Sequence, residues 1–198
     1  MDTSNKIYRI FVSSCIRLLE EERQILSRTI LQHGHHPFQM EFNFDGSTLE
    51  RSLSVDMEKI QQADSVICIL NYLYGEVIGE KRGDIHSCPL FQGDCKSVNC
   101  ACRSEPYSAC SLSFTEFEYE YSKLLGKKVF VIFNRQYKDL VAFKRAISSL
   151  DPQTANDYER AFMLFQRDNN RFVGQAIRYH AYPYSSIEEF KETPHKKR

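Results

Sequence analysis

The sequence has no net charge and no long apolar run. Its 26 basic residues balance its 26 acidic residues over 198 positions. Bulk nucleic-acid binding needs a basic face, so this balance argues against a nucleic-acid partner. Because no apolar run reaches about 18 residues, we also expect no membrane-spanning helix and no membrane partner.

The N-terminal residues, MDTSNKIYRIFVSS, lack the basic and then apolar segments that are typical of a secretory signal. We therefore expect a cytoplasmic, reducing compartment, in which the seven cysteines would be thiols or metal ligands rather than disulfides. Tryptophan is absent, but 14 Phe and 11 Tyr can supply a sizeable core. The length predicts one domain over residues 1–198.

Strand-like and helix-like segments alternate along the first two thirds of the chain. The strand-like segments are 7–13, 37–42, 65–70 and 128–133. The helix-like segments are 18–33, 54–63 and 113–125. This alternation predicts an α/β fold, a flavodoxin-like doubly wound parallel sheet with helices on both faces. In the helix at 54–63, Asp56 is expected in the first turn, where the helix dipole favours acids.

The last third of the chain, residues 136–198, has a weaker pattern. It predicts two helices, a late strand and a short final helix, at 139–150, 156–166, 177–184 and 187–191. Ser186, with Glu189 three residues later, has the spacing of a capping box at the start of the final helix.

Residues 76–111 interrupt the α/β pattern as a cysteine-rich insertion, because α/β connections usually have about 2–6 residues. Cysteine thiolates and a histidine could together supply the four ligands of a zinc site. The candidate zinc ligands are Cys88, Cys95, Cys100, Cys102 and Cys110, with His86. Their spacings lack the paired C-x2-C of a typical zinc motif, and the alternative is a loop with free thiols.

The segment SFTEFEYEYSKLLGKKVFVIF places three glutamates, at positions 116, 118 and 120, on one predicted helix. At about 100° per residue, the apolar side chains of this helix form one stripe that faces the sheet. Glu116 and Glu120 are expected on the opposite, solvent-facing side, and Glu118 at the edge of the stripe. Ser113 and Glu116 also match a capping box, in which Glu116 reaches back to the Ser113 amide.

Glu118 is therefore expected at the carboxyl edge of the sheet, where open α/β folds bind ligands. The helix dipole there favours an ionised carboxylate, which could stabilise a developing positive charge. The alternative is a boundary glutamate that reaches solvent and has no chemical role.

Three segments of the chain resemble the motifs of a known family. They are FVSSCIRLLEEER (11–23), ADSVICILNYLYG (63–75) and SFTEFEYEYSKLLGKKVFVIF (113–133). They resemble the FVSSTF-x-DL-x-x-ER, aspartate-plus-YG and SYTEMEYEYA-x-x-x-GKPV patterns of a TIR-like domain of unknown function, which often opens large NACHT-type ATPases and repeat proteins. The resemblance covers about residues 7–135 without the insertion. Cys15, Ile16, Leu18 and Lys128 depart from the pattern, and Leu18 replaces its aspartate.

The resemblance extends to the TIR and nucleoside deoxyribosyltransferase superfamily, in which a helix glutamate eight residues before a glycine serves at the ribose. Glu118 stands eight residues before Gly126. The resemblance implies an NAD glycohydrolase or ADP-ribosyl cyclase with NAD as substrate and Glu118 as its catalytic carboxylate. It would release nicotinamide and make ADP-ribose, or a cyclic or conjugated form of it. Nicotinamide leaves as a neutral base from a cationic precursor, so a second, acidic carboxylate is not required.

The same resemblance suggests the substrate-binding residues. They are Phe11, Ser13, Ser14, Arg17, Tyr74, Gly75 and Thr115. For the two serines the alternative is a turn or helix cap, and for Tyr74 it is a position in the core or at its rim.

Chains of this kind resemble the signal-making TIR enzymes of Thoeris-type antiphage systems, in which a separate effector protein senses the nucleotide product. This implies a small-molecule nucleotide substrate and a homo-oligomer. Two alternatives stay open. One is a non-catalytic recognition or assembly module, and the other is an N-glycosidase or deoxyribosyltransferase-like enzyme acting on nucleosides or nucleotides.

Overall fold

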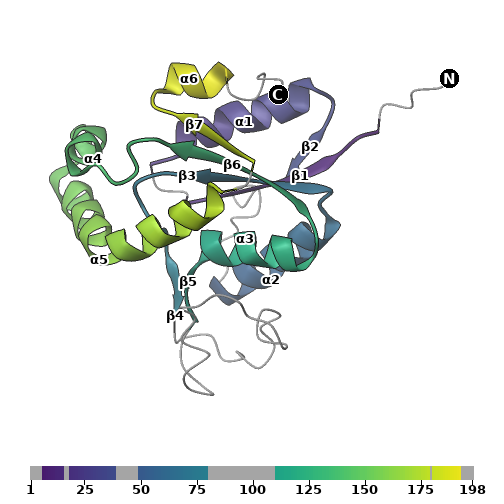
Figure 1. The fold of residues 1–198 in the computed structure, drawn as a ribbon, viewed down its shortest axis with the longest axis horizontal. Helices are drawn as coiled ribbons and strands as arrows, with labels where there is room; N and C mark the ends of the chain where they lie inside the picture. Colours follow the sequence, from purple (N-terminus) through teal and green to yellow (C-terminus); the bar gives the residue numbers. More distant parts are fainter. Residues whose placement is uncertain (1–5, 16–17, 39–48, 80–109, 179, 193–198) are drawn as a thin grey trace.

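A computed structural model describes residues 6–15, 18–38, 49–79, 110–178 and 180–192. Its central sheet has five strands, all paired in parallel, in the order β2-β1-β3-β6-β7 (Figure 1). The strands are β1 Arg9–Ser14, β2 His36–Phe38, β3 Ser65–Leu70, β6 Lys128–Asn134 and β7 Ala181–Tyr184. This is the flavodoxin-like order, in which the second strand flanks the first and the third lies on its other side. The predicted fold class is confirmed.

Helices cover both faces of the sheet. On one face lie α1 Glu20–Gln32 and α6 Ile187–Glu192, and on the other lie α2 Leu49–Gln62 and α3 Phe114–Leu124 (Figure 1). The long helix α5, Pro152–Ala176, packs its C-terminal part on the α3 side, while α4, Leu140–Ile147, lies beyond the sheet. Successive side chains of β1 pack on opposite faces of the sheet, so that Phe11 faces the α3 side and Val12 the α1 side.

Two helices are longer than the sequence predicts. Helix α2 begins at Leu49 rather than at position 54, so the placement of Asp56 in a first turn was wrong. Asp56 instead lies in the middle of α2 and is fully buried. Helix α5 continues to Ala176 because Phe172, Val173 and Ala176 pack into the core, a contact that local periodicity does not reveal.

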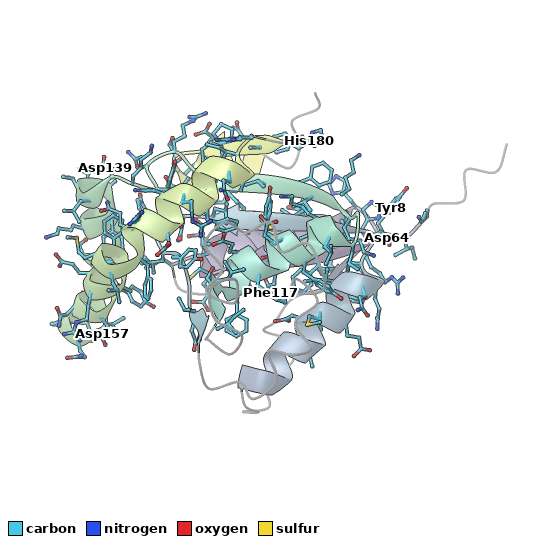
Figure 2. The ribbon with its side chains drawn as sticks, turned by 60° about the horizontal axis from the view of Figure 1, so that its bottom comes forward. Tyr8, Asp64, Phe117, Asp139, Asp157 and His180 are labelled. Carbon is cyan, nitrogen blue, oxygen red and sulfur yellow. The ribbon has the colours of Figure 1, made fainter. Side chains whose placement is uncertain are left out.

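The α4–α5 hairpin covers part of the carboxyl edge of the sheet. Cys15 follows β1, Tyr72 and Leu73 follow β3, and all three pack against apolar side chains of the hairpin. Phe143 of α4 and Phe162 of α5 stack with ring centroids 4.3 Å apart. In Figure 2 this hairpin, marked by Asp139 and Asp157, lies at the end of the molecule opposite Tyr8 and Asp64.

The ends of the predicted insertion form a short antiparallel ladder of β4, Val77–Gly79, and β5, Cys110–Ser113. The insertion therefore begins and ends in regular structure. The candidate zinc ligands Cys88, Cys95, Cys100 and Cys102, with His86, lie outside the described residues, and of Cys110 only the backbone in β5 is described. In the described part of the chain, no helix has the length and apolar character needed to cross a bilayer.

Candidate functional site

The strand order reverses between β1 and β3. From β1 the chain passes to β2 on one side, and β3 then pairs with the other side of β1. In open α/β sheets, ligands bind outside the carboxyl ends of the strands at such a point. Two of the predicted site residues, Ser13 and Ser14, end β1, while Tyr74 and Gly75 lie in the loop after β3.

Glu118 lies next to the point where the strand order reverses. Its helix, α3, packs under the sheet and against α2, and Figure 2 labels the preceding residue, Phe117. The Ser13 hydroxyl donates a hydrogen bond to Oε2 of Glu118 at 2.5 Å. The Glu118 side chain is 4% exposed and Ser13 is 1% exposed. The structure thus brings together two predicted site residues that are 105 positions apart in the sequence.

A second carboxylate, which the sequence interpretation did not connect with Glu118, comes from α2. Asp56 is 0% exposed, and no N–H or hydroxyl donor among the described residues bonds to either of its carboxyl oxygens. It interacts with the carboxyl group of Glu118. Because two ionised carboxylates have no hydrogen to share, a hydrogen bond between them requires one of the two to be protonated.

Burial raises the pKa of both acids. For Asp56 the pKa is raised to about 7, mainly by burial, while the charges of Lys59 and Arg23 oppose the shift. For Glu118 the pKa is raised well above the ordinary value, first by burial and then by the charge of Asp56. Burial between α2 and α3 thus opposes the helix dipole, which favours the ionised form of Glu118.

Arg23 provides the buried positive charge of the site. It lies on α1, is 1% exposed and donates from Nη1 to the Ser14 hydroxyl. Its charge lowers the pKa of both Asp56 and Glu118. Sequence reasoning chose Arg17, which lies outside the described residues, and missed Arg23. The available signal was the ER pair that closes the first motif.

Glu116 does not face solvent as predicted. It is 1% exposed, and its two carboxyl oxygens accept hydrogen bonds from Nη1 and Nη2 of Arg171 at 2.7 and 2.8 Å. The Tyr74 hydroxyl also donates to it. Half of the predicted capping box is present, because the Glu116 amide donates to the Ser113 hydroxyl at 3.2 Å. The solvent prediction was wrong because α5, which carries Arg171, covers the start of α3.

The remaining predicted residues occupy different environments. Gly75, with φ of +93°, lies where an added Cβ would be 3.7 Å from Thr115 Oγ1. Thr115 is 4% exposed. Phe11 is fully buried in the core, and Tyr74 packs its ring against Phe172 with its hydroxyl on Glu116. The core alternative for Tyr74 is the one that the structure shows.

Asn71, another residue that the sequence interpretation passed over, holds the loop after β3. Its side-chain oxygen accepts from the Leu73 amide at 3.1 Å, and its Nδ2 donates to the Leu18 carbonyl at 3.2 Å. From α5, Nδ2 of Asn169 donates to the carbonyls of Asn71 and Tyr72, both at 3.0 Å. These bonds fix the loop that carries Tyr74 and Gly75 against the rest of the site.

Comparison with known proteins assigns the chain to a family. The model described as "Domain of unknown function (DUF4062)" matches residues 9–191, which include all three motifs. The chain belongs to this DUF4062 family. No curated protein matches the sequence of this DUF4062 domain.

One solved structure that the DUF4062 domain resembles is titled "Structure of the activated Roq1 resistosome directly recognizing the pathogen effector XopQ (TIR domains)". The identity is 12% and the TM-score 0.40, over 96% of this chain and 85% of that chain. A similarity at this level assigns no function.

The DUF4062 domain also has a cavity of about 260 Å³, which lies on the α1 face of the sheet. It is lined mainly by apolar residues of α1 and the strands, including Leu26, Ile67 and Ile132, with His33 and His35 of the α1–β2 turn. None of the predicted site residues within the described part of the chain lines it. The chemistry-bearing group of Ser13, Asp56 and Glu118 is on the other face, closed by packing between α2 and α3.

Proposed function

We propose that this DUF4062 domain cleaves the N-glycosidic bond of NAD, with Glu118 as the catalytic carboxylate. The observation that supports it is the position of Glu118, which Ser13 orients by a hydrogen bond at the point of strand reversal. A carboxylate held in a water-poor site stabilises positive charge far more strongly than one in solvent. The resemblance of the three sequence motifs to those of TIR-like proteins supports NAD as the substrate.

In the proposed reaction, the bond between ribose C1′ and the nicotinamide nitrogen breaks, and its electron pair goes to that nitrogen. The ribosyl cation that develops is stabilised by the negative charge of Glu118. A water oxygen then bonds to C1′ and its proton is released, which yields nicotinamide, ADP-ribose and one proton. If a hydroxyl or a base nitrogen attacks in place of water, the product is a conjugated or cyclic ADP-ribose.

Because Glu118 is buried, the site must open before this reaction can occur. At 4% exposure the carboxylate cannot touch a ribose until the packing around it opens. Helices α2 and α3 form that packing, so binding of NAD is expected to separate the Asp56 region of α2 from Glu118.

The test is release of nicotinamide from NAD, followed by mass spectrometry of all small products. Glu118→Gln should abolish release. Glu120→Gln is the matched control, because Glu120 is on the same helix and forms a 3.4 Å ion pair with the exposed side chain of Lys123. Glu116→Gln is unsuitable as a control, since Glu116 binds Arg171. Full activity in a folded Glu118→Gln variant would refute the catalytic role.

A second candidate function is a non-catalytic assembly module that forms homo-oligomers. The observation in its favour is that Asp56, Glu116 and Glu118 are all buried, as in a closed core. Deoxynucleosides and nucleoside monophosphates should be assayed beside NAD, with size-exclusion chromatography of the same sample. A stable oligomer with no turnover of any of these substrates supports the module and refutes the enzyme.

Two further proposals follow from the sequence. We propose that the product signals to a separate effector protein in antiphage defence in the cytoplasm, and survival of phage-challenged cells carrying Glu118→Gln would test this. We also propose zinc bound by the cysteines of residues 76–111. Metal analysis of the purified chain tests it, and a metal content near zero would remove zinc.

A further inference from the structure

Exposed apolar side chains gather on the α4–α5 hairpin. Among the described residues, nine large apolar side chains are exposed, and four of them belong to this hairpin: Leu140 and Val141 of α4, and Met163 and Leu164 of α5. Met163 and Leu164 are 60% and 68% exposed, although they lie in the middle of a 25-residue helix. Adjacent exposed apolar side chains, unlike single ones, are typical of a surface that binds another molecule.

The outer face of α5 consists of Asp157, Arg160, Met163, Leu164 and Arg167, all of which are exposed. At about 100° per residue, these five positions fall within about 120° of one another around the helix. The buried apolar side chains of α5 are on the opposite side of the helix. In Figure 2, Asp157 lies on the side of the hairpin away from the sheet. The outer face is therefore open to a partner along the middle of α5.

The charges of the outer face are complementary to those of the same face turned end to end. Asp157 and Arg167 lie at equal distances before and after position 162, about 15 Å apart along the helix axis. In a two-fold pair of antiparallel helices, each residue faces the residue at the same distance beyond the centre in the other copy. With the two-fold axis at position 162, Asp157 of each copy faces Arg167 of the other, and two ion pairs form.

The apolar residues of the outer face lie near the centre of this arrangement. Met163 directly follows position 162, so the Met163 side chains of the two copies meet at the axis. Leu164 lies opposite Arg160 of the second copy, whose aliphatic stem can cover it. An apolar centre flanked by opposite charges has the composition of a specific protein interface.

We propose that the chain forms a two-fold dimer through the outer face of α5, with a second copy of the chain as the partner. The inner side of α5 keeps the bonds from Asn169 to the loop after β3, so the dimer and the candidate site use opposite sides of one helix. The proposal goes beyond the proposed reaction, because the pairing requires no NAD. Two helix faces bury less than about 1,200 Å² in total, so Kd should be on the order of 10–100 µM.

The test is sedimentation equilibrium of the full chain over roughly 5–500 µM, in reducing buffer because the chain has seven cysteines. Leu164→Glu puts a charge at the centre of the interface and should weaken the dimer roughly 10-fold or more. Asp157→Arg and Arg167→Asp each place like charges opposite one another and should weaken it by a similar factor, about 10-fold. Arg28→Asp, at an exposed arginine of α1 on the other face of the sheet, is the matched control and should leave Kd unchanged.

A mixture of the two charge-reversal variants gives a second result that does not depend on loss of binding. Asp157→Arg mixed with Arg167→Asp should restore the dimer, because each opposing pair is again an arginine against an aspartate. Restoration also shows that both variants are folded.

Three results would overturn the proposal. A wild-type chain that stays monomeric at the highest concentration overturns it and leaves the outer face to a different protein. A dimer whose Kd is unchanged in Leu164→Glu and in both charge reversals uses another surface. Weakened dimers that the mixture does not restore rule out the two-fold pairing. Nicotinamide release from NAD is measured separately, so a failure of the dimer and a failure of the proposed function are distinct results.

Discussion

Replacement of Arg171 by methionine should destabilise the domain strongly, because it would leave the charge of Glu116 in the interior. Both terminal nitrogens of Arg171 donate to Glu116, which is 1% exposed. Loss of one partner of a buried ion pair costs about 3–5 kcal/mol. A domain has about 5–15 kcal/mol of total stability, so this loss is a large fraction of it. Tyr74 still donates to Glu116, which sets the expected cost toward the lower end.

The assay is urea unfolding of wild type, Arg171→Met and a surface control, Arg135→Met. Arg135 pairs with Glu189 at 3.0 Å, but these side chains are 51% and 24% exposed, so its loss should cost less than about 1 kcal/mol. Adding Glu116→Gln to Arg171→Met should recover part of the stability, since the buried charge is then gone. Equal effects of the two arginine substitutions, or no recovery with Glu116→Gln, would refute the reasoning.

Two further predictions concern backbone strain and pH. Gly75→Ala should lower the unfolding free energy by about 1–3 kcal/mol, because Gly75 has a positive φ. Gly174→Ala, in a helix with open space around it, should raise the unfolding free energy by about 0.5–1 kcal/mol. Denaturant unfolding of both variants checks this, and a change of the same sign in both would contradict it. Asp56 has a raised pKa, so the stability from its proton is present below about pH 4, the unfolded value, and is lost as the pH rises to about 7. Over that window the unfolding free energy of wild type should fall by a few kcal/mol relative to Asp56→Asn, and a constant difference would argue against a buried proton.

The local sequence pattern was enough to predict the elements that are buried on both sides or capped by a nearby residue. The run SVICIL is strand β3 with the predicted bounds, because a continuous apolar run of that length fits the middle of a parallel sheet. Ser113 is the predicted cap of α3, because a side chain capping the third amide ahead needs no distant partner. The start of α2 at Leu49 was missed although the sequence carries a signal for it, since Ser47 with Glu50 three residues later has the spacing of a capping box.

The three glutamates of α3 show which properties the sequence determines and which depend on the tertiary structure. Helical periodicity distinguished Glu118 from its neighbours, because the angle around a helix depends only on spacing. It also placed Glu120 on the solvent-facing side of the helix, where the structure shows it paired with Lys123. For Glu116 the same periodicity failed, because a helix angle says which way a side chain points but not which element lies there.

The sequence by itself determined the order of the elements, the parallel sheet and the position of Glu118 against the core. Only the tertiary structure decided the partners of the acids. Arg171, 55 residues away, pairs with Glu116, and Ser13, 105 residues away, binds Glu118. Asp56 and Arg23 come to Glu118 from two other helices. These partners set the charge, burial and pKa of each carboxylate, and they meet only when β1, α1, α2, α3 and α5 pack together, since electrostatic interactions follow distance in space and not in sequence.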